Sequence, residues 1–367
     1  MAPIFLSSTA LTLLTGQAFA QRTVVPAHHG PDSESHVQWI STDSGFDAIK
    51  VHPINITSYD WWYFDSVQGV DAGLGNQASI SVTIRNSGQN GALPNDFPTD
   101  NFINIDMAWP NGSTHSWILM AGDAIISTPE GADGTSGVWE GSGVSFVGAP
   151  GMSWYTVYIN APDEGIVGSL YIESEAPAHY PCGPAEAGQD MRLAAGAGWI
   201  NPLPDGYSEA NFKVFGEDLR IQGRGYHDHN FGDQPLMSAI ETFYWGHGHL
   251  GGYSIVWIDA LTPDGVNTLS AYVARDGEIL VAGCEGIRAR PYGANSTYPP
   301  RLNSGRPTGF TVDIDTPEGQ LALRTETVYL TFEGLPFRQW SGFLTGTLNG
   351  EVLPQGVALW QQFAGAT

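Results

Sequence analysis

Residues 60–65 read DWWYFD, four consecutive aromatic side chains between two acids. Successive side chains of a β-strand point to opposite faces, so Trp61 and Tyr63 share one face with Asp65, and the other two aromatics occupy the opposite face. A strand with both faces aromatic is buried on both sides. A core strand and the wall of a ligand site both fit this pattern. A carboxylate on an aromatic face, however, needs a partner or a function.

Strand patterns continue along the rest of the chain. Alternating or β-branched runs lie at residues 80–85, 102–109, 154–160, 167–173, 253–259, 309–315 and 328–332. Asn-Gly or Asp-Gly pairs, which favour tight hairpin turns, lie at residues 111–112, 264–265, 276–277 and 349–350. The sequence therefore predicts an all-β protein of antiparallel hairpins, closed into barrels or sandwiches because so many strands would otherwise leave open edges.

Composition supports this class and excludes others. The 367 residues include 46 Gly and 24 Pro, which suits short strands joined by turns. Thirty-eight acids against 14 bases give a net charge of −24, which argues against a nucleic-acid partner. The only plausible helix is at residues 235–244. Residues 177–206, rich in Gly, Pro and Ala, are predicted to form a long excursion outside the core, and a domain junction is predicted near Pro235.

The N-terminus has the pattern of a secretory signal peptide at residues 1–20, with an apolar run and then Ala18-Phe19-Ala20 before the expected cleavage site. The apolar run is too short to span a bilayer, so no stable membrane insertion is expected. We expect a secreted or secretory-pathway protein. The asparagines of the three Asn-x-Ser/Thr sequons, expected to carry glycans, are Asn55, Asn111 and Asn295. In an oxidising compartment the two cysteines, Cys182 and Cys284, are expected to form a disulfide.

A second informative stretch, residues 223–233, reads GRGYHDHNFGD. His227 and His229 lie two apart on one strand face, and with Asp233 they match a two-histidine, one-carboxylate metal set. His247 and His249 form a second such pair. A hydrogen-bonded network that anchors a turn explains paired histidines equally well on spacing alone.

The two stretches together resemble a known family. WYFD at residues 62–65, followed by GYHDHNFG at 225–232, is similar to the paired signatures of carotenoid 1,2-hydratase and AttH-like proteins. Fungal members of that family include lipocalin-like Diels–Alderases. The resemblance covers most of the mature chain, but Phe231 stands where many relatives have Trp. It implies an N-terminal β-sandwich (residues 21–235), a C-terminal lipocalin-like barrel (236–367), an apolar pocket between them, and no metal or organic cofactor.

The same resemblance implies a pericyclase that performs a [4+2] cycloaddition on a hydrophobic small molecule. Within that family, the hetero-Diels–Alderases of tropolonic sesquiterpenoid pathways carry a secretion signal, and this chain resembles them in that respect. We therefore expect a reaction between a tropolone-type o-quinone methide and a terpene alkene. Two alternatives stay open. One is an intramolecular, decalin-forming Diels–Alderase on a polyketide, and the other is a secreted lipocalin-like carrier that leaves its ligand unchanged. Nothing in the sequence indicates an oligomeric state.

A cycloaddition needs aromatic walls and a donor that polarises a carbonyl, rather than a nucleophile or redox centre. Asp65 shares a strand face with two aromatics and Tyr253 shares one with Trp257, so the two faces are expected to oppose each other across the junction. The predicted catalytic groups are Asp65, Tyr226, His229 and Tyr253. The predicted substrate-binding walls are Trp61, Tyr63, Trp245, Trp257, Tyr272 and Trp340.

Overall fold

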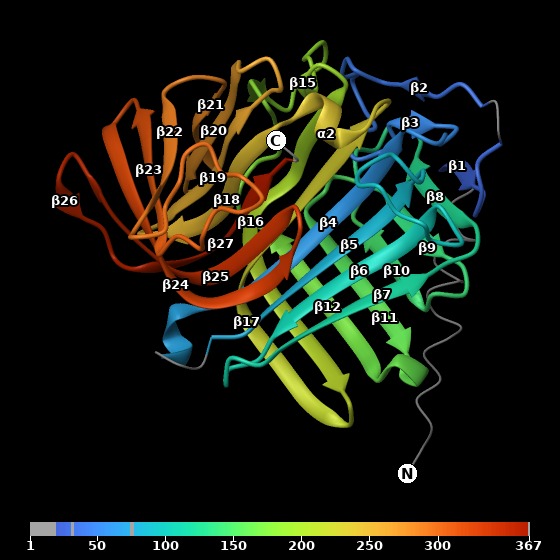
Figure 1. Cartoon of the computed structure of the whole chain (residues 1–367), viewed down its shortest axis with the longest axis horizontal. Helices are drawn as coiled ribbons and strands as arrows, with labels where there is room; N and C mark the ends of the chain where they lie inside the picture. Colours follow the sequence, from blue (N-terminus) through green and yellow to red (C-terminus); the bar gives the residue numbers. More distant parts are fainter. Residues whose placement is uncertain (1–19, 31–32, 74–76, 366–367) are drawn as a thin grey trace.

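Strands dominate the computed structural model, which describes residues 20–30, 33–73 and 77–365 (Figure 1). Residues 1–19 of the expected signal peptide lie outside these ranges. The predicted all-β class is confirmed. Within the described ranges, no helix has the length and apolar content needed to cross a membrane.

The first sheet holds 15 strands from the first two thirds of the chain. Along its main path these are β1 (Ala20–Val25), β8 (Ala124–Pro129), β9 (Ser136–Trp139), β10 (Val144–Gly148), β11 (Trp154–Ala161), β12 (Ile166–Ser174), β16 (Ala197–Val214), β17 (Glu217–Gly232), β4 (Tyr59–Gln68), β5 (Ser79–Ser87), β6 (Asn101–Ala108) and β7 (Thr114–Met120). The short strands β13 (His179–Tyr180), β14 (Gly183–Pro184) and β15 (Arg192–Ala194) attach beside β16. A separate pair is formed by β2 (His36–Val37) and β3 (Val51–His52).

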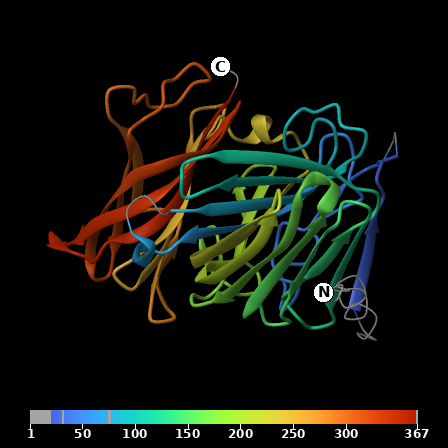
Figure 2. The same cartoon turned by 90° about the horizontal axis from the view of Figure 1, so that it is seen from below.

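This first sheet curls over its own core. Trp62 of β4 lies 5.8 Å, ring to ring, from Trp139 of β9, and Phe64 lies 5.2 Å from Phe146 of β10. Strands far apart in the sheet therefore share one core, and Figure 2 shows the curl from below. The two layers expected of a sandwich are thus opposite parts of one continuous sheet.

The second sheet holds ten strands, and residue 235 falls between the two sheets. Its strands are β21 (Glu278–Gly283), β20 (Asn267–Arg275), β19 (Tyr253–Leu261), β18 (Thr242–Leu250), β27 (Gly356–Ala364), β25 (Phe337–Leu348), β24 (Gly319–Gly334), β23 (Gly309–Thr316), β22 (Ile287–Tyr292) and β26 (Glu351–Val352). The backbone N–H of Ala289 on edge strand β22 donates to Asp259 of β19 at 2.9 Å, so the sheet curls toward closure. One face encloses its own core, and the other packs against the first sheet.

Two sequence-based expectations were wrong in part. Only Leu236–Ala239 (α2) of the expected helix is helical, because residues from Thr242 onward pair with β19 and β27 as strand β18. The expected excursion ends at Gly196, since Ala197 begins the long central strand β16. Glycine in this strand allows close packing: a Cβ at Gly198 would lie only 2.3 Å from the Phe231 ring.

The predicted disulfide between Cys182 and Cys284 is confirmed. Cys182 lies between β13 and β14, and Cys284 follows β21, so the bridge ties the first sheet to the second. Among the sequon asparagines, Asn111 and Asn295 are exposed and Asn55 is half-buried.

Candidate active site

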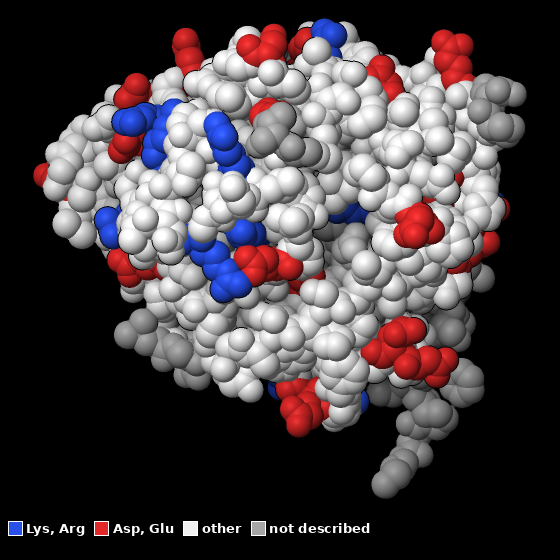
Figure 3. Space-filling model, in the orientation of Figure 1, with Lys and Arg blue, Asp and Glu red and all other residues white. Residues whose placement is uncertain are grey.

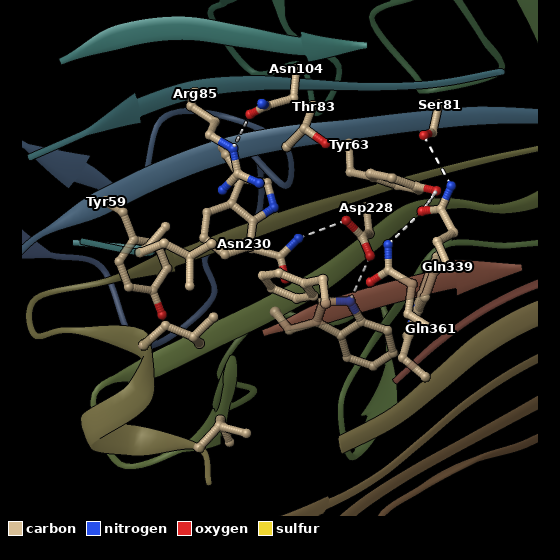
Figure 4. Close-up of a pocket in the computed structure, with 18 of the residues that line it drawn as sticks. Tyr59, Tyr63, Ser81, Thr83, Arg85, Asn104, Asp228, Asn230, Gln339 and Gln361 are labelled. Atoms are coloured by element: carbon tan, nitrogen blue, oxygen red, sulfur yellow. Dashed lines mark hydrogen bonds between the residues drawn. The ribbon is translucent and has the colours of Figure 1, made fainter. Parts of the chain in front are cut away.

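A cavity of about 300 Å³ lies between the two sheets. Its lining is mainly apolar and aromatic, with a small number of polar groups directed inward (Figure 4). Strands β4, β5, β6 and β17 supply one wall, and strands β18, β24, β25 and β27 supply side chains from the other sheet. The loop between β5 and β6 adds Leu93, Asn95 and Phe97. The expected pocket between two β-rich units is therefore present.

Strand register sets the order of the side chains on the first wall. Trp61 of β4 lies between Asn230 of β17 and Arg85 of β5. Two residues along β4, Tyr63 lies beside Asp228 of β17. Because alternate residues share a face, all five side chains reach the same cavity.

Asp228 is the buried acid of the cavity. Trp199 Nε1 and the Tyr226 hydroxyl donate to its Oδ2 at 2.9 and 3.0 Å, and Asn230 Nδ2 donates to its Oδ1 at 2.7 Å. Burial raises the pKa of Asp228 to about 6, against the opposing effect of these donors. A carboxyl with this pKa can exchange a proton near neutral pH.

Two glutamines from the second sheet complete the polar set. Gln361 Nε2 donates to Gln339 Oε1 at 2.6 Å, and Gln339 Nε2 donates to Ser81 Oγ at 3.1 Å. The Tyr63 hydroxyl lies 3.4 Å from Gln339 Oε1. These contacts join the two sheets across the cavity and orient amide groups at its edge.

Two further ionisable groups lie on β5 and β6. Burial lowers the pKa of Arg85 to about 10, so the guanidinium remains charged at neutral pH. Burial raises the pKa of Asp106 to about 6, and Ser116 Oγ donates to its Oδ1 at 2.5 Å. Register places Asp106 opposite Ser81, four residues along β6 from Phe102, the residue that faces Arg85.

Several predicted residues are brought together here. Trp61, Tyr63 and Trp245 line the cavity as expected of walls. Tyr226 lies behind the lining and donates to Asp228. Asp65 is also behind it, and its Oδ2 accepts from the Tyr63 hydroxyl at 2.9 Å and lies 2.8 Å from Nε2 of His247.

His229 was predicted to lie in the pocket, but this prediction was wrong. Residues 227 and 229 point to the face of β17 opposite residues 226 and 228. His229 is fully buried in the first-sheet core, where its ring lies 4.3 Å from Trp62 and contacts the carboxylates of Asp47 and Asp60. It cannot reach the cavity from that face.

Tyr253, Trp257, Trp340 and Tyr272 are not brought to the cavity either. Tyr253 and Trp257 face the separate core of the second sheet, because the even-numbered residues of β19 face the first sheet instead. Trp340 of β25 lies in the same separate core. The Tyr253 hydroxyl donates to Glu318 at 2.7 Å, near the surface. The Tyr272 hydroxyl donates to the Pro177 carbonyl at 2.7 Å beneath the β12–β13 connection.

The paired histidines serve hydrogen-bonded networks. His227 Nε2 lies 3.2 Å from Asp47 Oδ2, and His249 Nδ1 lies 2.8 Å from Asp205 Oδ2. Asp233 is exposed at the end of β17. In the described part of the chain, no group of three or more His, Cys, Asp or Glu is arranged to hold a metal ion.

Sequence reasoning missed Asp228, Arg85 and the glutamine pair. Alternation with Tyr226 was a usable signal for Asp228, since both side chains share a strand face. Arg85 ends the strand pattern at residues 80–85, and an arginine at the end of a strand is equally compatible with exposure to solvent. No sequence signal links Gln339 to Gln361.

The family model described as Diels-Alderase-like matches residues 31–289. The chain belongs to this family. Among curated relatives, the chain is 32% identical over 334 residues to the quinolone epoxide rearrangement protein asqO of Emericella nidulans, covering 90% of each protein. It is 29% identical to the quinolone epoxide rearrangement protein penF of Penicillium thymicola, covering 90% of this chain and 92% of that one. The Diels-Alderase poxQ of Penicillium oxalicum is 24% identical, over 75% of this chain and 65% of poxQ.

Solved structures agree on the fold of this Diels-Alderase-like protein. CghA, in a crystal structure with Sch210972, superposes with a TM-score of 0.74 at 17% identity, over 94% of this chain and 99% of CghA. Kievitone hydratase from Nectria haematococca gives a TM-score of 0.55 at 14% identity, over 90% of this chain and 98% of that one. The family and the named relatives support an enzyme of the cyclase type.

Proposed function

We propose that this protein isomerises a largely apolar small molecule within the cavity, with Asp228 as general acid toward an epoxide or carbonyl oxygen. The proposal rests on one observation, the carboxyl of Asp228 in an aromatic cavity with its pKa raised to about 6. The similarity to two quinolone epoxide rearrangement proteins supports an epoxide as the acceptor.

The chemistry balances without a further reactant. Asp228 gives its proton to the epoxide oxygen as the C–O bond breaks, and the electron-poor carbon is attacked by a neighbouring group of the same molecule. The rearranged product then loses a proton, which the carboxylate takes back. Trp199 and Tyr226 both donate to Oδ2, so Oδ1, with its single donor Asn230, is the oxygen available to the substrate. Aromatic walls exclude water, which would otherwise open the epoxide.

A [4+2] cycloaddition is the second candidate, supported by the Diels-Alderase relatives. Here Asp228 or the glutamine amides would polarise a carbonyl while the walls hold two π-systems together. The hetero-Diels–Alder reaction of a tropolone-type o-quinone methide with a terpene alkene stays a prediction, as does the decalin-forming alternative. A carrier would bind either substrate without converting it.

The test offers purified protein a set of quinolone epoxides and, separately, an o-quinone methide with a terpene alkene, and follows product ratios against the spontaneous reaction. We expect epoxide turnover that falls as pH rises through about 6, where Asp228 loses its proton. Asp228→Asn should slow it by about 10²- to 10⁴-fold. Asp218→Asn, which removes an exposed acid from the same strand, is the matched control. Wild-type rates in a folded Asp228→Asn variant would exclude the general-acid role.

We also propose that the chain enters the secretory pathway, loses residues 1–20 and carries glycan. The disulfide supports an oxidising compartment. Intact mass after expression in a fungal host should lack the signal segment and fall on deglycosylation, with Asn111 and Asn295 the more accessible acceptors. A retained Met1 with an unchanged mass would contradict this proposal.

A further inference from the structure

Arg85 is a cation in the apolar cavity, and among the described residues no carboxylate contacts it directly. Its Nε donates to Asn104 Oδ1 at 3.0 Å, while its two terminal nitrogens have no hydrogen-bond partner among the described residues. No carboxylate of the described chain lies within 4.0 Å of it. Figure 4 shows the guanidinium directed inward from β5. Figure 3 shows a basic side chain within the hollow that opens over β4 and β5.

The surroundings within the described chain hold this guanidinium in place without a counter-charge in direct contact. The guanidinium carbon, Arg85 Cζ, lies 4.7 Å from the ring centroid of Trp61 and 6.0 Å from that of Phe102. Rings at these distances attract a cation and restrict its movement. Burying a charge without a paired counter-charge is costly, and the lowered pKa of Arg85 reflects that cost. An unpaired, oriented guanidinium beside a cavity is what recognition of an anionic oxygen group requires.

Asp106 acts on Arg85 from a distance, and no ion pair within 4.0 Å joins these two described residues. It belongs to β6, where Phe102 rather than Asp106 is the residue opposite Arg85. The two charges still attract each other, and the charge of Asp106 opposes the fall in the pKa of Arg85. The Asp106 carboxyl accepts from Ser116 Oγ at 2.5 Å, whereas Arg85 donates through Nε to Asn104. The terminal nitrogens of Arg85 therefore remain available to a ligand.

We propose that Arg85 binds an acidic oxygen group of the substrate, a carboxylate or an ionised enol or phenol, while Asp228 acts on a second oxygen of the same molecule. The role of Asp228 in this assignment rests on the proposed function. Register places the two residues two strands apart and two positions out of step, which corresponds to roughly 12 Å between their Cα atoms. A small polycyclic molecule spans that distance. Binding of its acidic group to Arg85 therefore determines which of its other oxygens lies beside Asp228.

The test uses a matched pair of fluorescent probes, 8-anilinonaphthalene-1-sulfonate and its uncharged counterpart N-phenyl-1-naphthylamine. Mutual displacement shows that both occupy one site. The wild type should bind the sulfonate more tightly, and Arg85→Gln should weaken the sulfonate by about tenfold while changing the neutral probe less than twofold. Arg220→Gln, which removes an exposed arginine from β17, is the control and should change neither. A melting curve verifies that each variant is folded.

An unchanged sulfonate affinity in folded Arg85→Gln, or an equal loss for both probes, would overturn the proposal. If Arg85→Gln does not fold, Arg85→Lys keeps the charge but loses the planar fork, and it should give an intermediate loss confined to the sulfonate. Asp228→Asn separates the two proposals. Without the carboxylate, sulfonate binding should be retained or stronger, so a turnover assay that fails while charge discrimination persists rejects the reaction and not the anion site.

Discussion

The two faces of strands β4 and β17 carry similar side chains in different surroundings. On the core face, Asp47 and Asp60 flank the ring of His229 and every group is fully buried. On the cavity face, Asp228 accepts only neutral donors, and Arg85 has no carboxylate within 4.0 Å among the described residues. On the core face, the charged groups contact one another within the protein. On the cavity face, the Asp228 carboxyl and the Arg85 guanidinium have no charged group in direct contact within the part of the chain that the structure describes, and they are available to a ligand.

The carboxyl pKa values differ in the same way. Burial alone would raise the pKa of Asp47, but His227 and His229 lower it to about 2. Asp228 is equally buried, but it has no comparable cationic partner, and burial raises its pKa to about 6. Burial therefore yields a permanent anion on one face and a proton donor on the other, and the partner decides which.

The largest expected contrast is between two adjacent tryptophans. Trp62 is 0% exposed in the core and Trp61 is 8% exposed beside the cavity. Trp62→Ala should lower the free energy of unfolding by about 3–5 kcal/mol, because a large core side chain is lost. Trp61→Ala should cost less stability but change the product ratio, which chemical denaturation and product analysis measure on the same samples. Equal stability losses would remove the distinction between the faces.

The pH dependence of stability sharpens the comparison. Burial alone would lower the pKa of His229, but Asp60 and Asp47 raise it above 6.5, so its contribution is complete below pH 6.5 and is lost as pH rises through the folded pKa. Asp47 contributes above pH 3.8, and roughly 2 kcal/mol is lost as pH falls toward 2. Urea unfolding at pH 3, 5.5 and 8 should show that Asp47 contributes more to stability at pH 5.5 than at pH 3, and that His229 contributes more at pH 5.5 than at pH 8.

Single variants isolate each contribution, because the raised pKa values of Asp228 and Asp106 act on the wild type and on these variants alike. The stability lost on Asp47→Asn should be greater at pH 5.5 than at pH 3, and the stability lost on His229→Gln should be greater at pH 5.5 than at pH 8. Asp228 has the opposite sign, because its raised pKa disfavours the folded state above pH 3.8, so Asp228→Asn should be at least as stable as the wild type at pH 8. A lower stability of Asp228→Asn at pH 8 would contradict the assigned surroundings.

The smallest expected effect concerns Tyr253. Its hydroxyl contacts Glu318 and Arg275, away from the cavity. Tyr253→Phe should therefore leave turnover within twofold of the wild type and lower stability by about 1 kcal/mol or less. Steady-state rates and a melting curve are sufficient. A large loss of rate with intact stability would return Tyr253 to the site.

Local pattern was a good guide to strands and a poor guide to contacts. The strand at 253–259 and the turn at Asn349-Gly350 were predictable because alternation and positive φ are properties of a few neighbouring residues. The helix at 235–244 failed because pairing of Thr242 onward with two other strands outweighs local preference. Gln339 and Gln361 could not be foreseen as a pair, since their contact depends on long-range register.

The sequence by itself determined that Trp61 and Tyr63 share a face, and that Tyr226 and Asp228 share another, because a strand alternates whatever surrounds it. The tertiary structure decided that these faces line a cavity while His229 lies in a closed core. It also decided that Asp228 receives neutral donors and Asp47 receives imidazoles. The curl of the first sheet and the packing of the second against it set those partners, and partners, rather than residue types, fix the protonation of a buried group.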